Sequence, residues 1–135
     1  MKILVATDGS RYTKRMLAYL AAHDEWLGAQ HAYSVITVAA PLPARAAAVL
    51  PKDVLSAHYA EEAEKVLKPV RTFLARQGLT VEYLIKTGAA AETIAATASK
   101  GKYDMLVMGS HGHGSLGSLV LGSVASKVLA QCTTP

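Results

Sequence analysis

Residues 2–10, KILVATDGS, decide the fold of this chain of 135 residues. The first part of the stretch, residues 2–7, is a continuous run rich in Ile, Leu and Val, which is typical of a strand buried on both faces. Asp8, Gly9 and Ser10 interrupt this run, and Ser10 stands where it can cap a following helix. A doubly buried strand that leads into a helix indicates an α/β fold.

The rest of the chain continues this alternation of strands and helices. Gly28 is expected to end the first helix, and Pro69 to kink or split the second. The pattern predicts a three-layer, doubly wound parallel sheet with helices on both faces, in a single domain. The expected helices cover residues 11–27, 53–77, 89–99 and 123–131, the further strands cover residues 32–39, 79–86 and 104–108, and the long irregular segments are residues 40–51 and the glycine-rich loop 109–117.

Composition excludes several classes of protein. With 51% hydrophobic and 18% charged residues, the chain is not expected to be intrinsically disordered. The single cysteine, Cys132, cannot form an internal disulfide, so a disulfide-stapled secreted domain is excluded. The apolar start is too short for a signal peptide and no run is long enough to span a membrane, so a cytoplasmic protein is the simplest interpretation. The net charge of +4 is spread along the chain and does not favour nucleic acid as a partner.

The glycine-rich stretch at residues 109–123, GSHGHGSLGSLVLGS, fits more than one motif. The dinucleotide pattern G-x-G-x-x-G begins at Gly112, but it follows the fourth strand and no acidic residue comes after it, so NAD or FAD is not favoured. A P-loop would need a lysine before Ser115, and Walker-type hydrolysis is therefore not supported. The chain also contains no G-x-S-x-G nucleophile elbow, which argues against a serine hydrolase.

A third spacing, Gly109-x2-Gly112-x9-Gly122-Ser123, suits an anion. Glycines after a strand let backbone N–H groups approach a phosphate, and the free N–H groups and dipole at the start of the last helix favour negative charge. Asp8 ends the first strand and is better suited to accept a hydrogen bond from a base or a sugar, or to hold a metal. An ordinary flexible loop, and Asp8 as a simple helix cap, stay open as alternatives at this point.

Three features together resemble universal stress proteins of the kind that binds ATP: the opening ILVATDGS, the segment DMLVMGSHG at residues 104–112, and the G-2x-G-9x-G-S spacing. The resemblance spans residues 2–135. It implies a flavodoxin-like fold, similar to adenine nucleotide alpha hydrolases, with strand order 3-2-1-4-5 and usually a homodimer. It also implies ATP, or ADP or AMP, with Mg²⁺, in a stress sensor or switch with at most slow hydrolysis. The fifth strand of the family would follow Pro135, so we expect this chain to lack it.

The resemblance also implies which residues contact the nucleotide. Adenine or its ribose would contact Thr7, Asp8 and Val38, with Ala39 as the alternative to Val38. No catalytic residue and no metal ligand is assigned. Two other functions stay open: a nucleotide-independent, dimeric interaction module with an unknown protein partner, and a small flavin-binding enzyme or electron carrier. By the same resemblance, Met108 and Gly109 would support the ribose and phosphates, and the phosphate site would be lined by Gly112, Gly122, Ser123 and Val124.

Two histidines in the glycine-rich loop, His111 and His113, are candidates for a metal or a phosphate. Residues two apart in a loop can share a metal ion, but no third ligand is evident nearby in the sequence. Contact with phosphate is the favoured interpretation.

Charged residues gather on the expected helix over residues 53–77. Glu61 and Lys65, and likewise Glu64 and Lys68, stand four residues apart, a spacing at which opposite charges support a helix. We therefore expect these pairs on a solvated face, and paired catalytic carboxylates are not indicated.

Overall fold

The computed structural model describes the whole chain except residues 24, 26–27 and 113–120. Its sheet has the strand order β3-β2-β1-β4, as expected for the first four strands. β1 lies inside the sheet, because it pairs in parallel with β2 on one side and with β4 on the other. The strands are β1 (Lys2–Ala6), β2 (Ala32–Ala39), β3 (Val81–Thr87) and β4 (Met105–Met108).

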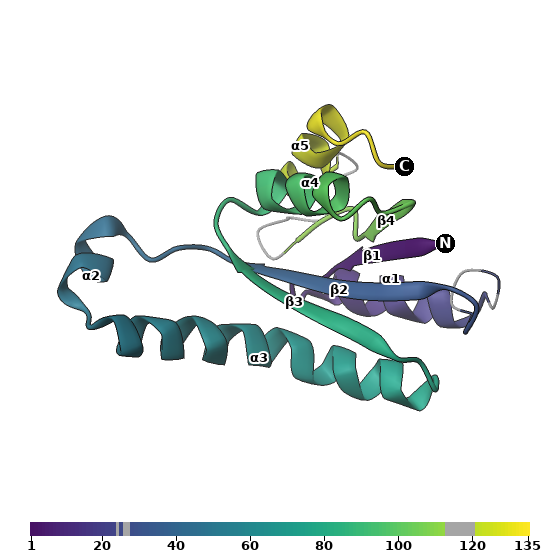
Figure 1. Ribbon diagram of the computed structural model, residues 1–135, viewed down its shortest axis with the longest axis horizontal. Coiled ribbons are helices and arrows are strands. Elements are labelled where there is room, and N and C mark those ends of the chain that lie inside the picture. Colours follow the sequence, from purple (N-terminus) through teal and green to yellow (C-terminus); the bar gives the residue numbers. More distant parts are fainter. Residues whose placement is uncertain (24, 26–27, 113–120) are drawn as a thin grey trace.

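Helices cover both faces of the sheet, which confirms the three-layer architecture (Figure 1). One face packs against α1 (Arg11–Ala21) and α3 (Lys52–Arg76), and the other against α4 (Ala90–Lys100) and α5 (Ser123–Gln131). A short helix, α2 (Ala44–Val49), lies in the connection between β2 and α3, away from the layers (Figure 1). No helix in the described part of the chain is long and apolar enough to cross a membrane.

The apolar run at the start of the chain is explained by the position of β1. Ile3 and Val5 point into the core on the side of α1 and α3, whereas Leu4 and Ala6 point into the core under α4 and α5. All four side chains are buried, and Leu4 is 0% exposed. Because successive side chains of a strand face opposite sides, a strand inside a three-layer fold needs apolar residues at every position.

The first helix is shorter than expected. It ends at Ala21, and the N–H of Ala22 donates both to Ala18 O, at 3.1 Å, and to Tyr19 O, at 3.2 Å, which is the tightened turn found at helix ends. Gly28 is therefore not the stop signal. Its carbonyl instead accepts the hydroxyl of Tyr33 at 2.6 Å, in the turn before β2. Residue 27, where the helix was expected to end, lies outside the described residues.

Two expectations about the middle of the chain are also corrected. The segment 40–51 is not wholly irregular, because its alanines, the residues of highest helix propensity, form α2. α3 is not split at Pro69 but runs through it. Leu67 and Val70, on either side of the proline, are 0% and 3% exposed, so packing against the sheet holds both parts of the helix in place.

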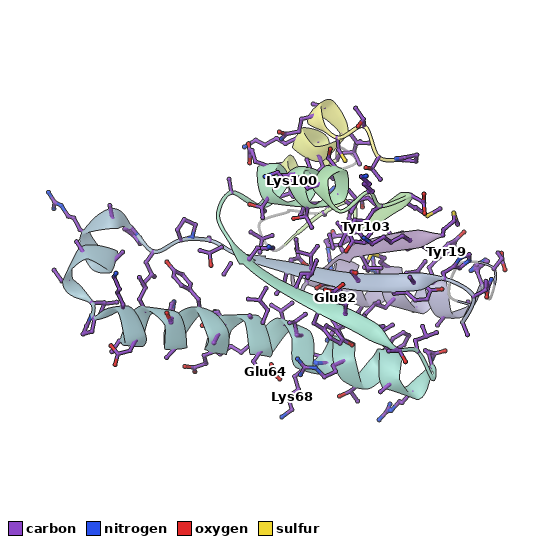
Figure 2. The ribbon with its side chains drawn as sticks, in the orientation of Figure 1. Tyr19, Glu64, Lys68, Glu82, Lys100 and Tyr103 are labelled. Carbon is purple, nitrogen blue, oxygen red and sulfur yellow. The ribbon has the colours of Figure 1, made fainter. Side chains whose placement is uncertain are left out.

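The ion pairs on α3 also differ from those expected. Lys65 donates to Glu62 at 3.0 Å, and Arg71 donates to both carboxylate oxygens of Glu64, at 2.7 and 3.3 Å. Residues seven apart lie on the same side of a helix, two turns from each other. A guanidinium can donate two parallel hydrogen bonds to one carboxylate. This contact holds the pKa of Glu64 below its usual value. Figure 2 shows Glu64 and Lys68 on the outer side of α3, as a solvated face requires. The expected pairs were Glu61-Lys65 and Glu64-Lys68.

Replacement of Leu67 by alanine tests the core between α3 and the sheet. Leu67→Ala should lower the free energy of unfolding by about 2–5 kcal/mol, because it leaves a cavity among fully buried side chains. Leu129→Ala is the matched control, since Leu129 is 70% exposed and its loss should change stability by less than about 0.5 kcal/mol. Urea denaturation measures both. Equal effects of the two substitutions would contradict the described packing.

Candidate functional site

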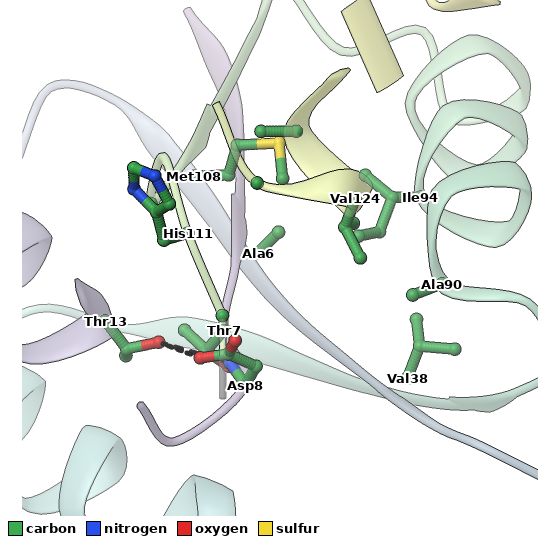
Figure 3. Close-up of a pocket in the computed structure, with 14 residues that line it drawn as sticks. Ala6, Thr7, Asp8, Thr13, Val38, Ala90, Ile94, Met108, His111 and Val124 are labelled. Atoms are coloured by element: carbon green, nitrogen blue, oxygen red, sulfur yellow. Dashed lines mark hydrogen bonds between the residues drawn. The ribbon is translucent and has the colours of Figure 1, made fainter. Parts of the chain in front are cut away.

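A cavity opens where the carboxyl ends of β1 and β4 meet the first turns of α4 and α5 (Figure 3). In a parallel sheet, this is the point where the chain turns away from β1 in one direction and from β4 in the other, so the loops separate and leave a crevice. Eight of the nine predicted contact residues line the cavity: Thr7, Asp8, Val38, Met108, Gly109, Gly112, Gly122 and Val124.

The ninth predicted residue, Ser123, is the first residue of α5, but it is exposed and does not line the cavity. For β2, the cavity is lined by Val38 and not by the alternative Ala39. The structure thus brings most of the predicted residues together. Which of them contact a ligand stays a prediction.

Asp8 is held by the turn that follows β1. Gly9 has a φ of 77°, a conformation that residues with a side chain rarely adopt, so the chain can reverse sharply before α1 begins. The Oδ1 atom of Asp8 accepts the N–H of Ser10 and the hydroxyl of Thr13, each at 2.9 Å. The carboxylate therefore stabilises the start of α1 and at the same time lines the cavity.

Thr7 fixes the end of β1 to β2. Its N–H and its hydroxyl both donate to the carbonyl of Ile36, at 2.9 and 3.3 Å, and the residue is buried. The side-chain donor of Thr7 is thus used inside the protein. Thr7 contributes to the cavity mainly as a rigid wall.

The start of α5 is fixed against the segment that follows β4. The N–H of Gly122 donates to the carbonyl of Ser110 at 2.8 Å. A Cβ atom at Gly122 would lie only 3.0 Å from both Ser110 O and His111 Cα, so any larger residue would have to push this backbone segment away. The first turn of α5 contains no acidic residue, and its N–H groups lack partners within the helix. This end of the cavity therefore favours an anion.

The wall of the cavity across from Asp8 is apolar. Val38 comes from β2, Ala90 and Ile94 come from α4, and Val124 comes from α5. Figure 3 shows Ile94, Ala90 and Val38 along one side, with Asp8 and Thr13 across from them. Such a cavity suits a ligand with a flat apolar part, a hydrogen-bond donor, and a negatively charged tail.

His111, one of the two histidines predicted to lie near a phosphate, lines the cavity. Its Nδ1 atom lies 2.9 Å from Ser110 Oγ, and its ring stands 5.0 Å from the ring of Tyr12, centre to centre. His113, the other histidine of the predicted pair, lies outside the described residues. Among the residues that the structure does describe, no group of three or more His, Cys, Asp or Glu could hold a metal ion.

Several residues of the cavity were not predicted from the sequence, above all Thr13, Ala90 and Ile94. Ala90 and Ile94 are four apart, so they lie on the same face of α4, which the helical spacing does indicate. The sequence does not indicate that the first turns of α4 lie beside the carboxyl ends of β1 and β2. Thr13 follows Asp8 by five residues, and only the sharp turn at Gly9 brings the two side chains together.

A family model and a curated relative both match this chain over nearly its whole length. The model of the Universal stress protein family matches residues 1–135. A Thermus aquaticus protein, described as a universal stress protein in the QAH/OAS sulfhydrylase 3′ region, is 36% identical over 143 residues, which cover 98% of this chain and 93% of that protein.

Solved structures show the same fold. The hypothetical protein MJ0577, the subject of a structure-based assignment of biochemical function, matches with a TM-score of 0.80 and 27% identity, over 99% of this chain and 91% of its own. A universal stress protein family protein from Arabidopsis thaliana, with AMP bound, matches with a TM-score of 0.69 over 100% of this chain and 88% of its own. At 17% identity, this second likeness shows the fold alone.

The close approach at Gly122 can be tested without any ligand. Gly122→Ala should lower the free energy of unfolding by about 1–3 kcal/mol, because the new methyl group meets backbone atoms that cannot move independently. The amide resonances of Ser110 and His111 should shift at the same time. Ser123→Ala is the neighbouring control, with an expected change of less than about 0.5 kcal/mol at this exposed position. A fully stable Gly122→Ala variant would show that α5 does not begin so close to Ser110.

Proposed function

Because the chain belongs to the universal stress protein family, we propose that it binds an adenine nucleotide, and specifically ATP, in the cavity at the carboxyl ends of β1 and β4. The observation that carries this proposal is the meeting of three features in one cavity. These are an apolar wall, a carboxylate and a helix N-terminus. The AMP found in the Arabidopsis thaliana protein of the same fold supports an adenine nucleotide as the class of ligand.

The geometry suggests how the nucleotide would lie. The adenine ring would pack against Val38 and Ile94, since a flat apolar group gains most from an apolar wall. Asp8 would accept a hydrogen bond from the base or the ribose. The phosphates would extend toward Gly109, Gly112 and Gly122, where backbone N–H groups and the dipole of α5 favour negative charge.

Two predicted phosphate contacts depend on the first turn of α5. Val124 lines the cavity, and its backbone N–H belongs to the group that lacks a partner within the helix. Ser123 lies at the helix start on the exposed side, so its hydroxyl would reach a phosphate only where the tail leaves the cavity. We therefore assign Ser123 to the end of the triphosphate. Met108 and Gly109 would support the ribose and the phosphates nearest to it.

Mg²⁺ would enter this site with the nucleotide. The described lining of the cavity offers a single carboxylate, that of Asp8, and its Oδ1 atom already accepts two hydrogen bonds. Mg²⁺ in nucleotide sites is commonly bound by substrate phosphates, water and only one or two carboxylates. The residues present fit a metal ion that the triphosphate carries, and they do not form a metal site of their own.

We assign the nucleotide the role of a switch. The cavity is lined by segments far apart in the chain, namely the turn after β1, the segment after β4 and the start of α5. A ligand that contacts all of these segments binds most tightly to the conformation in which they lie together. Binding therefore stabilises that conformation. The homodimer is a proposal that rests on the family resemblance, and the cytoplasmic location is a proposal that rests on the sequence pattern.

Calorimetric titration with ATP and Mg²⁺ tests nucleotide binding. The wild-type protein should bind ATP, and Gly112→Val should weaken binding about tenfold or more, because its side chain would enter the cavity. A Cβ at Gly112 would lie 2.8 Å from Asp8 Oδ2, so the Asp8 side chain must shift in this variant, and thermal unfolding measured beside the titration shows whether the variant is folded. Ala130→Val, on the exposed side of α5, is the matched control and should bind normally.

Absence of heat and of any thermal shift at millimolar ATP would contradict the proposal. It would favour the alternative, an interaction module that does not use a nucleotide. Titrations with ADP and AMP in parallel would show how much the outer phosphates contribute. If AMP binds as tightly as ATP, the α5 N-terminus is not a site for the triphosphate tail.

A further inference from the structure

We infer that Thr13 is a positioning residue, which orients the carboxylate of Asp8 so that the cavity selects a ligand with a hydrogen-bond donor. This inference rests on the proposed function and goes beyond it, because it assigns a specificity role to a residue on α1. Thr13 lines the cavity but is only 4% exposed, and its side chain faces Asp8 (Figure 3).

Two hydrogen bonds join Thr13 and Asp8. The hydroxyl oxygen of Thr13 lies 2.9 Å from Asp8 Oδ1 and 3.2 Å from the backbone N of Asp8. A backbone N–H can only donate and an ionised carboxylate oxygen can only accept. The hydroxyl must therefore accept from the N–H and donate to Oδ1, so both the direction of its proton and the side-chain torsion of Asp8 are determined.

The N–H of Ser10 completes this arrangement. It donates to the same Oδ1 atom at 2.9 Å, from the start of α1, where the helix dipole also favours a carboxylate. With two donors on Oδ1, the plane of the carboxylate is fixed. Oδ2 is then directed toward Gly112, where it lies 2.8 Å from the position that a Cβ atom would occupy.

The consequence concerns the ligand. A carboxylate oxygen fixed on the side of the cavity accepts hydrogen bonds and repels acceptors. It would favour a nucleotide that places a donor there, either the exocyclic amine of adenine or a ribose hydroxyl. Thr13 does not need to touch the nucleotide to produce this preference, because it acts through Asp8.

The experiment compares Thr13→Val with Thr13→Ser. Valine has nearly the same shape as threonine but can neither donate nor accept, whereas serine keeps the hydroxyl. Affinities are measured for ATP, for inosine triphosphate, which has an oxygen in place of the amine, and for 2′-deoxyATP, which lacks one ribose hydroxyl. The wild-type protein should prefer ATP over one of these analogues. Thr13→Val should reduce that preference about tenfold, and Thr13→Ser should retain it.

Two further measurements separate positioning from a general structural effect. In the ligand-free protein, the carboxyl carbon and amide resonances of Asp8 should shift in Thr13→Val and stay close to wild type in Thr13→Ser. With Asp8→Ala already present, Thr13→Val should leave the preference between nucleotides unchanged, because its effect passes through Asp8.

The outcomes decide between the two proposals. If the wild-type protein binds ATP but does not distinguish it from either analogue, or if Thr13→Val keeps the wild-type preference, the role of Thr13 is overturned and nucleotide binding stands. If the wild-type protein binds no nucleotide, both proposals are overturned.

Discussion

The burial of β1 between two neighbouring strands and two layers of helices is the constraint on which the rest of the structure depends. Leu4 is 0% exposed and Ile3 is 1% exposed, although their side chains point to opposite faces of the sheet. A strand buried in this way cannot shift by one residue without loss of its packing, so the position of its carboxyl end is fixed. Asp8 and Gly9, which follow that end, are therefore placed accurately beside the segment after β4, and the cavity exists because of this placement.

The end of the candidate site that favours an anion is built from backbone groups and from the start of α5. In the binding mode that we propose, the negative tail of a nucleotide would meet Gly122 and the first turn of α5, and the described lining of the cavity contains no lysine or arginine. This explains why the net charge of +4 gives little information about the ligand. We expect a methyl group added at Gly122 to be destabilising, since it would come within 3.0 Å of the backbone of Ser110 and His111.

The strands, the two layers of helices and the position of the cavity could be predicted from the sequence. Apolar periodicity indicates each strand and helix from a short stretch of sequence, and the glycine spacing indicates the loops at the ends of the strands. The end of α1 could not, since it depends on a tightened turn at Ala22 that has no strong sequence signal. The ion pair of Glu64 with Arg71 depends on which of several basic residues reaches the carboxylate. The contact between Thr13 and Asp8 depends on the turn at Gly9. The position of Ile94 in the cavity wall depends on how α4 packs on the sheet. Neither could be predicted without the three-dimensional structure.

The most direct test of the account is an amide-resolved NMR titration of the wild-type protein with ATP. The largest shifts should lie at Asp8, Gly109, Gly112, Gly122 and Val124, and the resonances of β3 and of the exposed face of α3 should stay in place. Absence of shifts, or shifts centred on a surface remote from the carboxyl ends of β1 and β4, would contradict it.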